Sequence, residues 1–150
     1  MRLRVENTID RMPGVVFDFV ARDHWRNHPR WDPNIVEITP LEDAAIGAGS
    51  RARVRRKRDS GDELLEVLEF EPNSRWVSRS QIGPLTLKMT ALIEPAPHEA
   101  SRLTLLAETH ATGPMRWLLP ALAPVFRRQM RRSLERIKEM VESPAGGEPR

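Results

Sequence analysis

The sequence lacks cysteine and has no long apolar run, and these two absences exclude several kinds of protein. Without cysteine there is no disulfide, no thiolate metal site and no cysteine nucleophile. A membrane-spanning helix needs about 18 to 20 apolar residues, whereas the nearest candidate, MRWLLPALAPVF (115–126), contains an arginine and two prolines. The first ten residues alternate apolar and polar side chains and contain no apolar segment of a secretory signal. We therefore expect a soluble, cytoplasmic protein.

Lysine is also scarce, so arginine carries almost all of the positive charge, and the formal net charge is +3. Two arginine clusters, RARVRRKR (51–58) and RRQMRR (127–132), raise the question of nucleic-acid binding. Neither cluster contains interleaved aromatic residues, and the second follows the solvent face of an amphipathic helix. We do not expect a nucleic-acid partner. Transient contact with an anionic membrane surface suits these arginines better.

The N-terminal region predicts one strand and two short helices. Residues 2–9 alternate with period two, which indicates a strand. Pro13 fits the first turn of a helix that GVVFDFVAR (14–22) continues. Pro29 and Pro33 interrupt the segment after it.

The rest of the chain predicts an antiparallel sheet and a long final helix, and hence an α+β fold. Residues 34–112 contain six alternating segments separated by turns rich in glycine and proline. Residues 114–142 carry an apolar stripe at steps of three and four, with Pro120 and Pro124 expected to kink or delay the start of the helix. The stripe consists of Leu122, Phe126, Met130, Leu134, Ile137 and Val141. The predicted order is β-α-α-β-β-β-β-β-β-α.

This order is that of the helix-grip fold, in which a curved seven-stranded antiparallel sheet wraps around a long C-terminal helix. The segment VENTIDRMPGVVFDFVARDHWRNHPRWDPNIVEI (5–38) resembles the START-like (SRPBCC) superfamily of polyketide cyclases/dehydrases and lipid-transport proteins. Members of that family open with a strand, a proline-started "VF" helix and a short second helix ending in W-x-P. GAGSRARV (47–54), VLEFEPNSRW (67–76) and ASRLTLLAE (100–108) resemble its later strand and turn signatures. The resemblance covers residues 2 to about 142.

The resemblance implies a hydrophobic pocket between the sheet and the final helix, binding a lipid, a polyketide or a steroid-like molecule, and it implies no cofactor. The family shares a cavity rather than a reaction. Some members cyclise or dehydrate polyketides, and others bind or carry their ligands. No motif here selects one activity, so three functions stay open: a binding or carrier protein, a cyclase/dehydrase-type enzyme, and a protein-interaction module without ligand. Two or more convergent titratable groups in the cavity would favour the enzyme, and an apolar pocket would favour the carrier.

RDHWRNHPRWDPN (22–34) is the densest cluster of histidine, tryptophan and aspartate in the chain. His24 and His28 have the spacing of one helix face and, with Asp23 or Asp32, suggest a metal site. However, a proline follows directly, and the glutamate of the zinc-protease motif is missing. We therefore expect no metal.

The same stretch has a more ordinary interpretation. Trp31 is an anchor in the core or pocket, and Asp32 and Pro33 start the turn into the next strand. His28 then lines the mouth of the pocket as a hydrogen-bond donor.

Strand parity points to a second polar pair, Arg56 and Glu66. Arg56 shares the inner face of its strand with Val54, because the opposite face carries only cations. Glu66 shares a face with three apolar residues, Leu64, Leu68 and Phe70. These two residues are either polar groups in the pocket that orient a ligand, or a screened pair in water at the open end of the sheet.

The turn between these two strands sets their register. A three-residue turn at 60–62 would place Arg56 opposite Glu66 and Val54 opposite Leu68. A two-residue turn would place Arg56 opposite Leu65 and Val54 opposite Val67, and would leave Leu68 and Phe70 in water. We prefer the first register because it pairs apolar with apolar residues and plus with minus.

The later strands place a row of side chains on the inner face: Trp76, Ser78, Ser80, Leu87, Met89, Ala91, Ile93, Leu103, Leu105, Ala107 and Thr109. The small members of this row either leave space for a ligand or let the helix approach closely. The predicted ligand-binding residues are Trp31, Val54, Arg56, Glu66, Leu68, Phe70, Trp76, Ser78, Met89, Ala91, Leu105, Ala107, Thr109, Trp117, Leu122, Phe126 and Met130. If the protein is an enzyme, the catalytic candidates are Arg56, Glu66 and His28.

The length of 150 residues and a hydrophobic content of 39% predict one globular domain, which we place at 1–142. The tail SPAGGEPR (143–150) is predicted to be disordered. The protein is expected to be a monomer or a homodimer.

Overall fold

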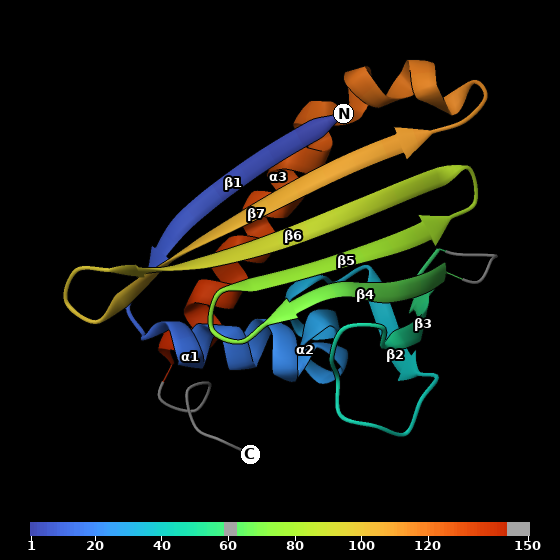
Figure 1. Ribbon diagram of the computed structural model, residues 1–150. Helices are drawn as coiled ribbons and strands as arrows, with labels where there is room; N and C mark the ends of the chain where they lie inside the picture. The colour runs from blue at the N-terminus through green and yellow to red at the C-terminus, as the bar shows by residue number, and fades with distance from the viewer. Residues whose placement is uncertain (59–62, 144–150) are drawn as a thin grey trace.

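The computed structural model describes residues 1–58 and 63–143 (Figure 1). The elements are β1 (Arg2–Ile9), α1 (Pro13–Phe17), a π-helical turn η1 (Asp18–Arg22), α2 (His24–Trp31), β2 (Ile35–Pro40), β3 (Arg51–Arg56), β4 (Glu63–Glu71), β5 (Arg75–Ile82), β6 (Leu85–Ala96), β7 (Ala100–Ala111) and α3 (Met115–Glu142). The predicted order of strands and helices is confirmed. The predicted turn at 60–62 and residues 144–150 of the predicted tail lie outside the described residues.

The seven strands form one antiparallel sheet in the order β1-β7-β6-β5-β4-β3-β2. Strands β2 to β7 follow one another along the chain, and β1 joins the far edge beside β7. Figure 1 shows the sheet curving, with α3 crossing one face and with α1 and α2 lying across one end. This is the α+β helix-grip architecture that the sequence predicts.

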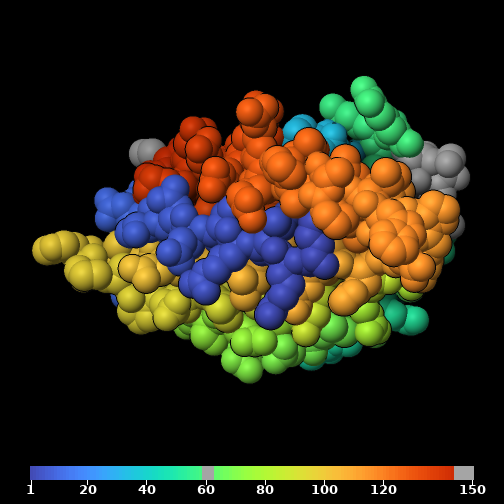
Figure 2. Space-filling model, turned by 90° about the horizontal axis from the view of Figure 1, so that it is seen from above, coloured from blue at the N-terminus to red at the C-terminus, as the bar shows by residue number. Residues whose placement is uncertain are grey.

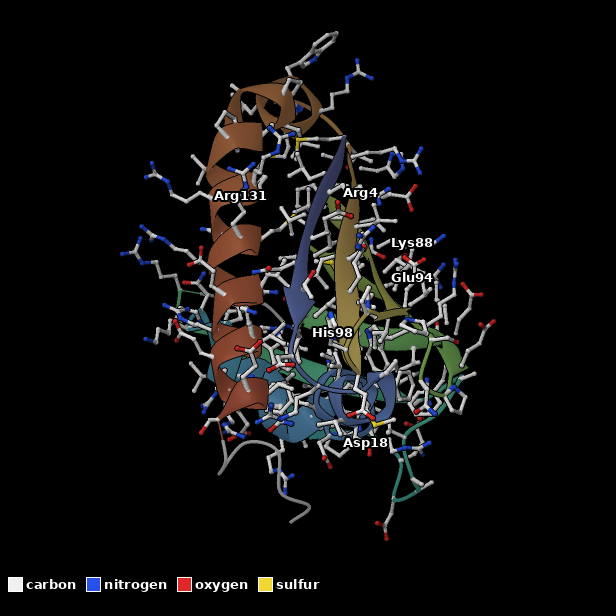
Figure 3. All side chains as sticks on the ribbon, turned by 90° about the vertical axis from the view of Figure 1, so that its left-hand side faces the viewer. Arg4, Asp18, Lys88, Glu94, His98 and Arg131 are labelled. Carbon is white, nitrogen blue, oxygen red and sulfur yellow. The ribbon has the colours of Figure 1, made fainter. Side chains whose placement is uncertain are left out.

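Helix α3 packs its apolar stripe against the inner face of the sheet. Met130, Leu134, Ile137 and Val141 are buried and belong to the same core cluster as Leu3 of β1. Figure 3 shows α3 along one side of the sheet, while Lys88 and Glu94 point away from the opposite face. The sheet therefore has one face in contact with a helix and one face in water.

The first turns of α3 depart from the predicted stripe. Pro120 and Pro124 lie inside the helix, and in Figure 1 its first turns run at an angle to the remainder. Proline inside a helix removes a backbone hydrogen bond and bends it. The apolar stripe consequently reaches the core only from Phe126 onward, and Leu122 is 36% exposed.

The corner between α1 and α2 contains the π-helical turn, which the sequence did not predict. Pro13 starts α1 as expected, but the helix widens into the π turn before α2. Side chains of α2 bind two carbonyls of this turn: His24 through Nδ1 to Val20 O at 2.8 Å, and Asn27 through Nδ2 to Phe19 O at 3.0 Å. Such turns interrupt regular helices and frequently mark functional sites.

The predicted register between β3 and β4 is wrong, and the alternative that was not preferred also differs from the structure. Val54 lies opposite Glu63, and Arg51 lies opposite Glu66. The connection covers residues 57–62, which is longer than either of the predicted turns. A longer connection shifts the pairing, and a shift by an odd number of residues exchanges the two faces of the strand.

A β-bulge at Leu68 is the second reason for this error, since the register against β5 shifts between the two residues that flank it. Phe70 faces inward as predicted, opposite Trp76. Because of the extra residue, the residues of β4 before the bulge point to the opposite face from the one expected by counting back from Phe70. The inward residues of β4 before the bulge are therefore Glu63, Leu65 and Val67, all of them buried.

No helix in the described part of the chain is long and apolar enough to cross a membrane.

Candidate functional site

A cavity of about 290 Å³ lies between the inner face of the sheet and α3. The sheet contributes both large apolar side chains, such as Trp76, Met89 and Leu105, and small ones, namely Ser78, Ser80, Ala91, Ala107 and Thr109. Helix α3 contributes larger apolar ones: Phe126, Met130 and Ile137. Most of the exposed wall is apolar, and the volume is at the lower end of the range for small-molecule sites.

One end of the cavity is polar, where α2 crosses the sheet. His24 and His28 line it from α2, and Asp32, Asn34 and Arg56 line it from the segments beside them. Both histidine rings are positioned by stacking on tryptophan rings. The ring of His24 stacks on Trp76 with centroids 4.3 Å apart, and that of His28 stacks on Trp31 at 5.1 Å.

Arg56 is the only cation in the cavity wall among the described residues, and it is paired with carboxylates. Its Nε binds Glu63 Oε1 at 2.5 Å, and its Nη2 binds Glu63 Oε2 at 3.3 Å. Asp32 Oδ2 lies 3.8 Å from Nη1 of the same guanidinium. Because Glu63 is only 1% exposed, the two-point pair compensates a charge that would otherwise be costly to bury.

Both histidines of α2 are uncharged near neutral pH. Burial lowers the pKa of His24 well below its ordinary value of 6.5, and the neighbouring His28 lowers it further. Burial, followed by the positive charge of Arg56, lowers the pKa of His28 to about 3. Asp32 Oδ2 lies 3.9 Å from His28 Nε2, too far for a hydrogen bond.

The comparisons with known proteins identify the family. The family model described as "Polyketide cyclase / dehydrase and lipid transport" matches residues 1–142. The chain belongs to this family. The resemblance noted in the sequence is thus confirmed over nearly the whole chain.

Several solved structures share the fold of this chain. TTHA0849 from Thermus thermophilus superposes with a TM-score of 0.73 at 18% identity, covering 94% of this chain and 97% of that one. Ara h 8.0201 superposes with a TM-score of 0.74 at 16% identity, covering 94% and 97%. The di-domain ARO/CYC BexL from the BE-7585A biosynthetic pathway gives 0.71 at 18% identity, covering 96% of this chain and 48% of BexL.

At these identities the structural matches show the fold of the polyketide cyclase, dehydrase and lipid-transport family and nothing finer. No curated protein sequence matches the chain. The function within the family has therefore to be argued from the cavity itself.

The cavity brings together a majority of the predicted ligand-binding residues. Those in its wall are Trp31, Arg56, Trp76, Ser78, Met89, Ala91, Leu105, Ala107, Thr109, Phe126 and Met130. His28, a catalytic candidate, is also in the wall, at the end formed by α2. Whether these residues bind a ligand stays a prediction.

Six of the predicted residues do not line this cavity. Glu66 lies on the outer face, where its Oε1 accepts a hydrogen bond from Arg79 Nη2 at 2.9 Å, so the predicted place beside Arg56 is wrong. Val54 and Phe70 belong to the core outside the cavity wall, and Leu68 is at the bulge. Trp117 and Leu122 lie on the first, exposed turns of α3.

Several residues in or next to the wall were missed at the sequence level. Glu63, which does not itself line the cavity, replaces Glu66 as the partner of Arg56, and Leu65 replaces Leu68 on the inner face, both because of the register. Gln129 and Ser133 face the cavity from α3. Their spacing relative to Phe126, Met130 and Ile137 was a usable signal, because polar residues at positions i+3 and i+7 interrupt one apolar helix face.

The histidine pair is not part of a recognisable metal centre. Among residues 1–58 and 63–143, no group of three or more histidine, aspartate or glutamate side chains is arranged to hold a metal ion. The His24 and His28 rings meet edge to face, with centroids 4.6 Å apart and planes at 61°.

Proposed function

We propose that the protein binds a hydrophobic small molecule, such as a lipid, a polyketide or a steroid-like compound, in the cavity between the sheet and α3. The observation that carries this proposal is a partly open, mainly apolar space between the sheet and α3, on whose sheet side small side chains such as Ala91 and Ala107 lie among larger apolar ones. Protein cores are normally filled to the density of organic crystals. A space of about 290 Å³ in that position is therefore best explained by a ligand.

Transport of the ligand is supported by the exposed first turns of α3, which lie on the surface in Figure 2. Trp117 is 74% exposed, and Leu118, Leu122 and Val125 are exposed beside it. No acidic residue occurs between Glu108 and Glu135, whereas arginine occurs at 116, 127, 128, 131 and 132. An apolar patch with flanking arginines and no acid suits contact with an anionic membrane surface.

A cyclase or dehydrase-type enzyme is the second candidate, favoured by one observation. Four titratable side chains, His24, His28, Asp32 and Arg56, converge at the polar end of the cavity. A general base works best with a pKa near the working pH, whereas the pKa of His28 is about 3. The cavity is thus better suited to hold a ligand than to abstract a proton with this residue.

The test uses an uncharged fluorescent probe, N-phenylnaphthylamine, with the full chain. We expect enhanced probe emission on binding, and we expect native mass spectrometry of the purified protein to show a bound small molecule and the oligomeric state. Thr109→Phe, which fills the cavity wall, should weaken probe binding by about tenfold or more.

Thr86→Phe is the matched control because Thr86 lies on the outer face, one residue away from the inward Leu87. It should bind the probe as the wild type does. Equal binding by both variants, with both folded, would exclude the cavity as the binding site.

A further inference from the structure

The polar end of the cavity contains two hydrogen-bond acceptors without donors. His24 Nδ1 lies 2.8 Å from Val20 O, and because a carbonyl only accepts, the proton of the neutral ring is on Nδ1. His24 Nε2 is then a lone pair. It is buried and has no hydrogen-bond partner among the described residues.

His28 provides the second acceptor. Its Nε2 lies 3.9 Å from the Asp32 carboxylate, and although this distance is too long for a hydrogen bond, the negative charge repels a lone pair on that nitrogen and so favours the tautomer that carries the proton there. His28 Nδ1 is consequently a second lone pair, and it too is buried without a partner in the part of the chain that the structure describes. Buried acceptors without donors are rare and destabilising, and a ligand that donates one hydrogen bond would satisfy one of the two.

The charges at the same end disfavour an anion. The described residues there provide one guanidinium, Arg56, and two carboxylates, Asp32 and Glu63, while both histidines are neutral. Arg56 is held by Glu63 at two points. A ligand carboxylate would meet an environment that is already negative, and its own charge would lose hydration on entering the cavity.

We propose that the cavity selects an uncharged apolar ligand carrying a hydroxyl group, an alcohol or a phenol, which donates its hydrogen bond to one of the two imidazoles of His24 and His28, over a carboxylate of the same apolar body. This inference rests on the proposed function, because it assumes that the ligand occupies the cavity. It adds the polar group of the ligand and its orientation, with the hydroxyl toward α2 and the apolar body toward β6, β7 and α3.

Three probes with the same apolar body test this selectivity by calorimetry near neutral pH: naphthalene, naphthol and naphthoate. We expect naphthol to bind about three- to tenfold more tightly than naphthalene, because this is the gain in affinity that one additional hydrogen bond typically provides. Naphthoate should bind at least about tenfold more weakly than naphthol. If naphthol binds no better than naphthalene, or naphthoate binds as well as naphthol, the selectivity is wrong while the cavity site stands. If none of the three binds, the proposed function itself is wrong.

The double variant His24→Phe/His28→Phe assigns the effect to the imidazoles. It keeps an aromatic ring at both positions, and a change in the shape or polarity of the wall affects both probes, so the test is the ratio of the naphthol to the naphthalene affinity, which should fall to about one. His110→Phe, an exposed histidine of β7, is the control and should keep the preference. An undiminished preference in the double variant would overturn the proposal.

A measurement on the wild type covers the case in which the double variant does not fold. Side-chain ¹⁵N NMR should show Nε2 of His24 and Nδ1 of His28 as unprotonated nitrogens. Naphthol, but not naphthalene, should shift at least one of them in the direction of a nitrogen that accepts a hydrogen bond. Identical spectra with the two probes would contradict the proposal.

Discussion

Arg56 of β3 and Glu63 of β4 form a two-point ion pair at the polar end of the cavity, with Nε–Oε1 at 2.5 Å and Nη2–Oε2 at 3.3 Å. The two residues are the last of one strand and the first of the next. The pair therefore ties the ends of β3 and β4 together while it neutralises a buried carboxylate.

Glu63→Gln should lower the free energy of unfolding by about 2 kcal/mol, because it removes the main partner of a partly buried guanidinium. Urea unfolding checks this value. Glu66→Gln is the matched control on the same strand, because Glu66 pairs with Arg79 in an exposed bridge. It should cost less than about 1 kcal/mol. Equal losses in the two variants would mean that the ion pair at Glu63 is no more important than one at the surface.

Leu134→Ala should destabilise the protein by about 2–5 kcal/mol, since Leu134 is 3% exposed in the stripe that α3 packs on the sheet. Leu122→Ala, in the same helix, should cost less than about 1 kcal/mol, since Leu122 is 36% exposed. Chemical unfolding of both variants tests where the packed part of α3 begins. Similar losses would show that the first turns of α3 belong to the core.

The two neutral histidines predict a stability that falls with acidification. Their pKa values are lower in the folded protein than the ordinary 6.5, so the unfolded chain binds more protons below that pH. His28 should cost about 2 kcal/mol of unfolding free energy between about pH 7.5 and pH 5, a range above the ordinary pKa of glutamate, and His24 should act in the same direction. For His28 the loss continues toward its folded pKa of about 3.

The pH dependence can be assigned with His28→Gln, measured by urea unfolding at several pH values. This variant should have a shallower slope than the wild type, by up to about 1.4 kcal/mol per pH unit. His110→Gln, at an exposed position of β7, should keep the wild-type slope. If His28→Gln also keeps it, His28 is not the origin of the effect.

The exposed turns of α3 predict binding to anionic vesicles. Sedimentation with phosphatidylglycerol vesicles should show binding that decreases with salt, and Arg127→Ala should weaken it about fivefold. Trp117→Ala should also weaken it, through loss of an interfacial aromatic side chain. Leu64→Ala is a control, because Leu64 is an exposed apolar residue of β4 outside this patch. Vesicle binding that none of these changes affects would place the contact elsewhere or exclude it.

The sequence predicted the faces of β5, β6 and β7 because these strands pair without interruption. Trp76 lies opposite Ala91, and Ala91 lies opposite Leu105, so alternation alone locates the inner row. In β4 the same reasoning failed, since a bulge at Leu68 reverses the alternation and leaves no clear mark in the sequence. Element order and periodicity were therefore sufficient for the fold but not for the polar wall.

The polar end of the cavity could be predicted only in part, for a different reason. His24, His28 and Asp32 come from one stretch and Arg56 comes from β3, and only the crossing of α2 over the strands brings the two together. The π-helical turn before α2 also sets the direction of the His24 ring through its bond to Val20. Neither the crossing nor the turn follows from residue spacing.

The pairing of β1 with β7 joins distant parts of the chain. Leu3 and Ile137, which both belong to the cavity wall, come from the first strand and the last helix. A binding site whose walls are this far apart in sequence exists only after most of the chain has folded, and non-local pairing of this kind slows folding. A bound ligand would contact both the first strand and the last helix. It would therefore stabilise the whole molecule against unfolding, rather than one element.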